Sequence, residues 1–192
     1  MKICLFGGSF DPIHSGHLAV AEQVLENNLC DKIWFIPCYK NPLKKEPTKT
    51  EHRKKMIEIA IKKKENFELN EIELNKKETN YTLETVKELK KEFPEHKFCF
   101  IIAAKALDDF HKWKNPEELL KEIEFIIVSV ENALELPLEI QEVNPKKLKP
   151  TKHSDVSSTV IRKRIKEGKS VSGLLPEKVF DYIKKNHLYG FK

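Results

Sequence analysis

The sequence has few cysteines, and they are not spaced for a zinc site or a disulfide framework. Its 192 residues include only Cys4, Cys30, Cys38 and Cys99, and no two of them form a Cys-x-x-Cys pair. No apolar run approaches the length of a membrane span, and the first residues lack the basic flank and apolar stretch of a signal peptide. We therefore expect a cytoplasmic protein with reduced thiols, no membrane partner and no metal held by protein side chains.

The sequence also has only a small excess of charge of one sign. The formal net charge is +5 although 34% of the residues are charged, because lysines alternate with glutamates along the expected helices. This small basic excess favours anionic ligands. There is no repeat, no low-complexity segment and no aromatic–basic recognition motif, so a nucleic-acid-binding module is the weakest of the function classes.

Glycine is scarce too, with six residues, yet two of them are adjacent in the segment 7–18, GGSFDPIHSGHL. This segment follows a short apolar run, residues 3–6, and leads into a helical pattern that begins near Ser15. Gly7 and Gly8 permit a sharp turn whose N–H groups an anion can approach. The helix start adds unpaired N–H donors and the positive end of the helix dipole.

Two histidines flank that helix start. His14 and His17 lie three residues apart, so both imidazoles can point to the same side, and Gly16 between them leaves space for a ligand. A lone histidine or a glycine pair is usually incidental. Found together directly after the first strand, they predict a phosphate-binding site.

Expected strands and helices alternate along nearly the whole chain. The strands are at 2–6, 32–36, 67–74, 97–104, 125–130 and 138–143, and the helices at 16–27, 51–64, 81–92, within 106–122, from 157 and from 176. A capping box of Thr48 and Glu51 is expected to open the second helix. The alternation predicts one α/β domain over residues 1–192, a doubly wound, Rossmann-like parallel sheet with helices on both faces. Ligands bind at the carboxyl ends of such strands, where the segment 7–18 lies.

A second segment, SSTVIR at 157–162, has the same features as the first. Ser157 is expected to cap a helix, and Ser158 and Thr159 place hydroxyl and N–H groups at its start, where a phosphate is stabilised. Arg162 lies one turn further on, within reach of the same phosphate. By itself this segment reads as an ordinary serine cap with a surface arginine, and the first segment is what favours the phosphate interpretation.

These two segments resemble the nucleotidyltransferase superfamily with the His-x-Gly-His signature, and within it the bacterial nicotinate-nucleotide adenylyltransferases. The similarity covers essentially the full chain. It includes His52-Arg53 with Met56, Glu73, NYTLETVKEL at 80–89, Phe100–Ala104, Trp113, and LLPEKVFDYIKKNHLY at 174–189. The resemblance implies the nucleotidylyl transferase fold.

The resemblance also implies a reaction, in which ATP and nicotinate mononucleotide give deamido-NAD and pyrophosphate. The nicotinate ribotide phosphate attacks the α-phosphorus in line, so the protein positions two polyanions and stabilises charge. The implied catalytic residues are His14, His17 and Arg162. Implied ATP contacts come from Gly7, Gly8, Ser9, Phe10, His14, His17, Lys44, Lys105, Ser158, Thr159 and Arg162. Mg²⁺ is expected on the ATP phosphates, held mainly by ligand and water.

The resemblance assigns nicotinate mononucleotide to Ser9, Phe10, Lys44, Tyr81, Thr82 and Trp113. Tyr81, Thr82 and Trp113 match the family segments that frame the pyridine ring, although a core aromatic is the other interpretation of the tryptophan. A homo-oligomer is compatible with the sequence, and the preference between nicotinate and nicotinamide forms stays open.

The sequence departs from the family in two places. Asn41-Pro42-Leu43-Lys44 stands where the family has Pro-Pro-His-Lys, and Ala103-Ala104-Lys105 stands where it has Gly-x-Asp near the nucleotide. Either Lys105 contacts a phosphate while Asp108 or Asp109 takes the role of the acid, or nucleotide affinity is much reduced. The alternatives are therefore another adenylyl- or cytidylyltransferase of the superfamily, such as one acting on phosphopantetheine, and a nucleotide-binding homologue with reduced or lost activity.

Overall fold

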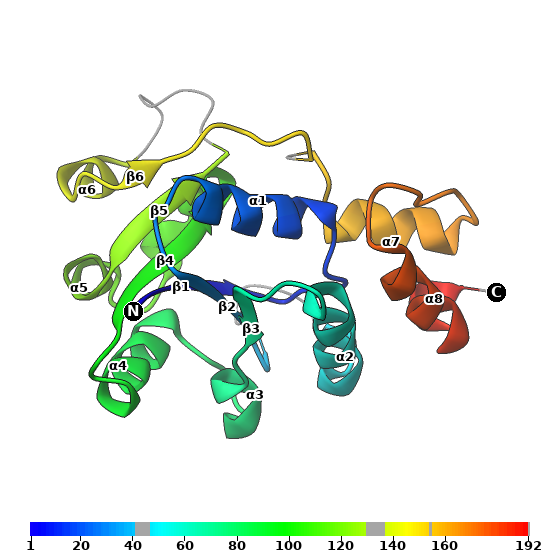
Figure 1. Cartoon of the computed structure of the whole chain (residues 1–192), viewed down its shortest axis with the longest axis horizontal. Helices are drawn as coiled ribbons and strands as arrows, with labels where there is room; N and C mark the ends of the chain where they lie inside the picture. Colours follow the sequence, from blue (N-terminus) through cyan, green and yellow to red (C-terminus); the bar gives the residue numbers. More distant parts are fainter. Residues whose placement is uncertain (41–46, 130–136, 154, 192) are drawn as a thin grey trace.

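The structure, a computed structural model, is organised around one six-stranded parallel sheet (Figure 1). It describes residues 1–40, 47–129, 137–153 and 155–191, without the side chains of Lys105 and Leu138. The strands are β1 (Lys2–Gly8), β2 (Lys32–Pro37), β3 (Phe67–Leu69), β4 (Lys97–Ala103), β5 (Glu124–Val128) and β6 (Lys146–Lys147). Their order is β3-β2-β1-β4-β5-β6. This is the Rossmann order, and it confirms the predicted fold class.

Helices cover both faces of the sheet. They are α1 (Ser15–Glu26), α2 (Thr50–Ile61), α3 (Ile72–Lys76), α4 (Thr82–Glu92), α5 (Pro116–Glu122), α6 (Leu138–Glu142), α7 (Ser158–Lys166) and α8 (Glu177–Lys185), with the 3₁₀ segments η1 (Ala104–Lys112) and η3 (Leu188–Gly190). Apolar residues of α1, α2, α7 and α8 pack on one face, and those of α4, α5, α6 and η1 on the other. Figure 1 shows α1 and α2 on one side of the sheet and α4 and α5 on the opposite side.

The strand order determines where a ligand can bind. The chain moves outward in one direction from β1 to β3 and in the other from β4 to β6, so the direction of winding changes between β1 and β4. These two strands pair in parallel, and their carboxyl ends carry Gly7-Gly8 and Ala103. In doubly wound sheets the ligand crevice opens at this switch point. Both the glycine turn and the Ala103-Ala104-Lys105 departure therefore lie at the predicted site.

Two predicted strands differ from the structure: the one at 67–74 is shorter, and the one at 138–143 is a helix. The alternating residues 67–74 form only the short β3, because the chain turns into α3 directly after Asn70. The Asn70 N–H still donates to the Phe35 oxygen of β2, while its side-chain oxygen accepts from the Ile72 N–H at the start of that helix. Residues 138–143 form α6, which begins after Pro137 and buries Ile140, and the last strand is β6. In both places a short apolar pattern fits a strand and a helical turn equally well.

The predicted capping box at the second helix is also absent. Lys49 is the N-cap residue of α2, and no side chain caps it. Thr48 is engaged elsewhere, since its N–H donates to the carboxylate of Asp11. By contrast, Ser157 caps α7 as predicted, with its hydroxyl oxygen accepting from the Val160 N–H at 3.3 Å.

The remaining global expectations concern thiols and membranes. All four cysteines are buried, and none of them is in a disulfide. Among the residues that the structure describes, no helix combines the length and the apolar character needed to cross a membrane.

Candidate active site

A buried aromatic side chain, that of Phe10, packs beneath the turn that follows β1. Phe10 has a positive φ of 47°, and its ring is buried with only 2% exposed. The ring packs against Phe6 at 5.6 Å and His17 at 5.0 Å between centroids. Gly7 and Gly8 are predicted to make the turn themselves, but they are the last residues of β1 and pair with the last two residues of β2, so the turn begins after them. A Cβ on Gly8 would lie 3.1 Å from the Phe10 ring, so glycine allows this close packing. Phe10 can therefore offer only its backbone to a ligand.

The two histidines predicted as phosphate donors stack on each other. Their ring centroids are 3.6 Å apart, and the planes are 26° from parallel. The backbone N–H of His14 donates to Nδ1 of His17 at 3.3 Å, which leaves Nε2 to carry the proton in the neutral form of His17. His14 is 5% exposed, and this burial lowers its pKa to about 4. His14 is thus neutral at pH 7, with a buried Nδ1 that has no hydrogen-bond partner among the described residues.

Gly16 makes this stack possible. A Cβ at this position would lie 2.8 Å from the backbone oxygen of His153 and 3.1 Å from the imidazole of His14. Contacts under 3.0 Å to backbone are too short for a real Cβ atom. The glycine of His-x-Gly-His therefore serves two packing contacts, one of them to a segment far along the chain.

The second predicted segment lies directly against the first. The guanidinium of Arg162 donates to the backbone oxygen of Asp11 at 2.6 Å and to Oγ1 of Thr159 at 3.3 Å. The Ser158 hydroxyl donates to the backbone oxygen of Pro12 at 3.0 Å. The start of α7 therefore stands beside the turn that leads into α1, and two helix N-termini converge on one place. Their N–H groups and dipoles favour the same anion.

Asp11 is the buried centre of the contacts behind the turn. Its Oδ1 accepts from the Tyr189 hydroxyl at 2.7 Å, and its Oδ2 accepts from the Thr48 N–H at 3.1 Å. Burial, with the Asp11 carboxylate adding to it, raises the pKa of Tyr189 far above its ordinary range. The residue is therefore a permanent neutral donor at physiological pH. The sequence gives no sign of this role, because Asp11-Pro12 by itself is typical only of a loop.

The predicted pyridine-ring residues come from two elements. Tyr81 is the extended N-cap residue of α4, and Thr82 is the first residue of that helix. The side chain of Asn80 accepts from the Tyr39 N–H at 3.1 Å, which fastens this segment to the end of β2. Trp113 is half-buried, 5.4 Å from Phe110 between centroids.

Trp113 is connected to the glycine turn through one more aromatic ring. It packs edge-on against Phe100 at 6.2 Å, and a Cβ on Gly7 would lie 3.3 Å from that Phe100 ring. The side chain of Lys114 lies over the ring of Tyr81, 4.6 Å from its centroid. The tryptophan segment thus borders both the turn and the start of α4, as a shared ring-binding site requires.

Comparison with known proteins decides the family. The cytidylyltransferase-like family matches residues 5–164. A Bacillus pumilus protein described as "Probable nicotinate-nucleotide adenylyltransferase" is 41% identical, over 98% of this chain and 98% of its own length. The nicotinate-nucleotide adenylyltransferase of Bacillus subtilis is 36% identical, again over 98% of each chain. The chain belongs to the nicotinate-nucleotide adenylyltransferases.

Solved structures agree with this assignment. The Plasmodium falciparum nicotinic acid mononucleotide adenylyltransferase complexed with NaAD superposes with a TM-score of 0.85 at 27% identity, over 100% of this chain and 98% of that one. The same protein complexed with APC gives 0.83 at 26% identity, with the same coverage. The predicted family and the predicted activity, a nucleotidyltransferase of NAD biosynthesis, are confirmed.

Two predicted phosphate contacts cannot be placed. Lys44 lies outside the described residues, and so does the side chain of Lys105. The backbone of Lys105 is in η1, directly after β4. Of the two acids considered beside it, Asp109 forms an exposed ion pair with Lys112 at 2.6 Å, and Asp108 is exposed. Within the described ranges, no three His, Cys, Asp or Glu side chains are arranged to hold a metal ion.

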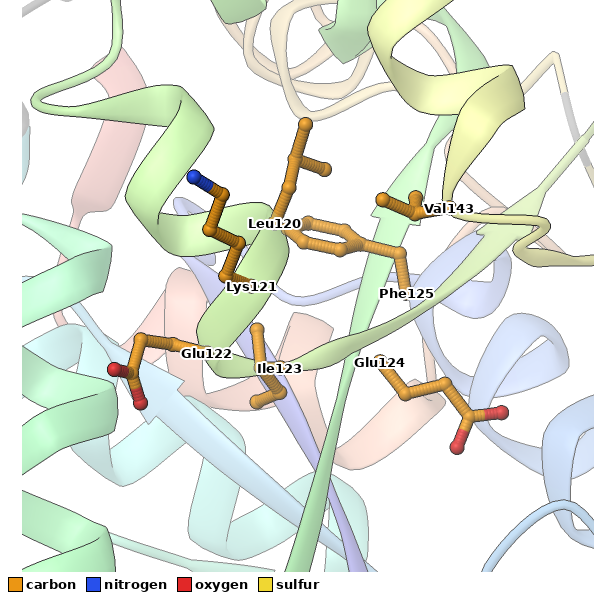
Figure 2. A pocket seen from close by; sticks show the side chains of 7 residues that line it. All are labelled: Leu120, Lys121, Glu122, Ile123, Glu124, Phe125 and Val143. Carbon is orange, nitrogen blue, oxygen red and sulfur yellow. The ribbon is translucent and has the colours of Figure 1, made fainter.

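A separate groove at the other end of the sheet is not part of this site. It lies where α5 runs into β5, lined by Leu120, Phe125 and Val143, whose apolar side chains point toward one another (Figure 2). The carboxylates of Glu122 and Glu124 point away from them. Because Glu124 opens β5, the groove lies at the amino end of the strand, opposite the glycine turn.

Proposed function

We propose that the convergence of the segments 7–18 and 157–162 binds ATP and nicotinate mononucleotide and catalyses in-line adenylyl transfer between them. The single observation that carries this proposal is the 2.6 Å hydrogen bond from Arg162 to the backbone oxygen of Asp11. It joins two phosphate-type helix starts that are 151 residues apart in sequence. The whole chain, residues 1–192, serves this reaction as one domain.

His14 and His17 act as donors to the α- and β-phosphates. The two imidazoles stack at 3.6 Å between ring centroids, and burial keeps His14 neutral at pH 7, so that His14 is suited to donating a hydrogen bond and is not a strong base. Neither histidine forms a bond to phosphorus. Negative charge shifts onto the bridging oxygen as the α–β bond breaks, and fixed N–H donors stabilise that charge.

The start of α7 and Arg162 hold the pyrophosphate that leaves. Ser158 and Thr159 are the first two residues of the helix, and Thr159 is exposed. The guanidinium has five N–H donors, so its two contacts to protein leave others for the β- and γ-phosphates. Gly7 and Gly8 give backbone contacts to ATP, Ser9 and Phe10 give them to both nucleotides, and Lys44 and Lys105 add positive charge.

Tyr81, Thr82 and Trp113 bind the nicotinate ring and its carboxylate. The backbone N–H groups at the start of α4 suit a carboxylate, and the half-buried indole offers an apolar face. The ring-binding residues are connected to the glycine turn through Phe100, which places the pyridine and phosphate ends of one substrate on neighbouring elements.

Mg²⁺ accompanies ATP in this proposal and is held by phosphate oxygens and water. The only carboxylate of the turn, Asp11, has both oxygens engaged by Tyr189 and Thr48, so the turn offers no acidic ligand. When bound, the ion neutralises charge on the phosphates. We place the enzyme in the cytoplasm as a protein that acts on small molecules, with homo-oligomers compatible with the fold.

The test is pyrophosphate release from ATP and Mg²⁺ with three acceptors, nicotinate mononucleotide, nicotinamide mononucleotide and phosphopantetheine. We expect turnover with nicotinate mononucleotide and little with the other two. Turnover with phosphopantetheine alone would replace the proposed substrate with that of another superfamily transferase. A folded protein that binds ATP but is silent with all three would mean that Ala103-Ala104-Lys105 has removed catalysis.

A further inference from the structure

Arg53 is 0% exposed, and it is the largest fully buried side chain among the residues that the structure describes. It lies on the core-facing side of α2, three and four residues before the equally buried Met56 and Ile57. A guanidinium removed from water is costly unless its N–H groups find partners. The hydrogen-bond partners of Arg53 therefore indicate its structural role.

All three nitrogens of Arg53 donate to main-chain carbonyl oxygens. Nε donates to Thr48 at 2.8 Å, Nη1 to Ser9 at 2.9 Å and Nη2 to Tyr39 at 3.1 Å. Three carbonyls from three separate segments are thus fixed by one planar group. A fully buried guanidinium N–H that loses its acceptor is left unsatisfied, so each of these bonds is costly to lose.

The three segments all border the proposed site. Ser9 is in the turn after β1, Tyr39 follows the end of β2, and Thr48 precedes α2. Thr48 also donates its N–H to the carboxylate of Asp11, whose backbone oxygen receives the Arg162 guanidinium. Arg53 is therefore linked to two residues of the turn that carries His14, to Ser9 directly and to Asp11 through Thr48.

We propose that Arg53 is a positioning residue for adenylyl transfer, fixing the turn 9–14 against the ends of β2 and α2. This inference rests on the proposed function of the turn. Arg53 touches no substrate, since its side chain is enclosed by protein. It acts by holding the backbone that carries the phosphate donors, and displacements of about 1 Å in such donors can cost about 100-fold in rate.

Lysine cannot replace arginine in this role. A guanidinium presents its donors in a rigid, planar fork, whereas an ammonium is a single point with three donors. The ammonium of Arg53→Lys can therefore keep the charge and one carbonyl, but not all three. The substitution separates the positioning role from the mere presence of a buried cation.

The experiment compares Arg53→Lys and Arg53→Met with Ile57→Val, a control at a buried residue of α2 whose apolar side chain cannot hydrogen-bond to the three carbonyls. Melting temperatures and circular dichroism spectra are recorded first. Steady-state pyrophosphate release is then measured below every melting transition. We expect Arg53→Lys to lower kcat about tenfold or more, with KM for both substrates changed by less than about threefold. Ile57→Val should lower the melting temperature and leave kcat within about twofold.

Either of two results would overturn the proposal. A kcat for Arg53→Lys within about twofold of the unsubstituted enzyme would show that the fork is not needed for positioning. Loss of the folded spectrum in Arg53→Lys would assign the residue to stability alone. An unsubstituted enzyme that is inactive with ATP and nicotinate mononucleotide contradicts the proposed function instead, and it is recognised before any variant is compared.

Discussion

Acid should destabilise this protein through His14. Burial holds the pKa of this imidazole at about 4, while in the unfolded chain it returns to about 6.5. Because the folded-state pKa is the lower one, the unfolded chain takes up the proton first as the pH falls. Stability is therefore constant above about pH 6.5 and decreases between about 6.5 and 4. The difference of about 2.5 between the two pKa values corresponds to about 3 kcal/mol, of which about 2 kcal/mol is already lost at pH 5.

The assay is urea unfolding of the unsubstituted protein and His14→Asn at pH 7, 6 and 5. Other titrating groups affect both proteins, so the difference between the two unfolding free energies isolates His14. We expect that difference to change by about 2 kcal/mol between pH 7 and 5, in the direction that favours the variant in acid.

A pH-independent difference would refute the reasoning, because it would mean that His14 is as accessible to protons in the folded protein as in the unfolded chain.

The burial of His14 also predicts proton uptake when ATP binds in acid. A phosphate beside the imidazole favours its charged form, so ATP binding near pH 5 should take up a proton. Calorimetry in two buffers of different ionisation enthalpy measures that proton directly.

Further predictions test the rest of the site. Gly16→Ala would ordinarily add up to about 1 kcal/mol of helix stability, but its Cβ would lie 2.8 Å from a backbone oxygen, so thermal melting should show a loss, with kcat reduced at least about tenfold. Trp113→Ala should raise KM for nicotinate mononucleotide about tenfold and leave KM for ATP within about twofold, as initial-rate kinetics would reveal. Arg162→Lys should reduce kcat/KM for ATP by about 10–100-fold, since an ammonium cannot reproduce the fork. Tyr189→Phe removes the hydroxyl from the buried carboxylate of Asp11 and should lower the unfolding free energy by about 1–3 kcal/mol in urea titrations.

The sequence signals that succeeded are local ones. The segment 7–18 contains its glycines, its helix start and both histidines within twelve residues, so one strand–turn–helix pattern is enough to recognise it. The fold class followed from the alternation of strand and helix patterns, which does not depend on how the strands are ordered. The errors at 67–74 and 138–143 occurred where an apolar pattern was too short to distinguish a helical turn from a strand.

The roles of Arg53 and Tyr189 were not evident from the sequence, because they depend on contacts between residues far apart along the chain. Arg53 contacts a carbonyl 44 residues away, and Tyr189 contacts Asp11 across 178 residues. No spacing rule links such positions. One signal was available, because Arg53 lies on the same helical face as Met56 and Ile57. A charged residue on the apolar face of a helix is expected to be buried with hydrogen-bond partners.

The departure at Ala103 differs in kind from the requirement at Gly16. Ala103 has a φ of −74° and ψ of 139°, an extended conformation that any residue adopts, and its side chain is exposed at the carboxyl end of β4. The fold therefore does not need the family's glycine here, and the added methyl can matter only to a ligand that approaches this strand end. At Gly16 the protein itself occupies the space of a Cβ. A change at Gly16 should thus reduce stability and rate together, whereas Ala103→Gly should leave the melting temperature nearly unchanged and act, if at all, on KM for ATP. An altered melting temperature with an unaltered KM would contradict this distinction.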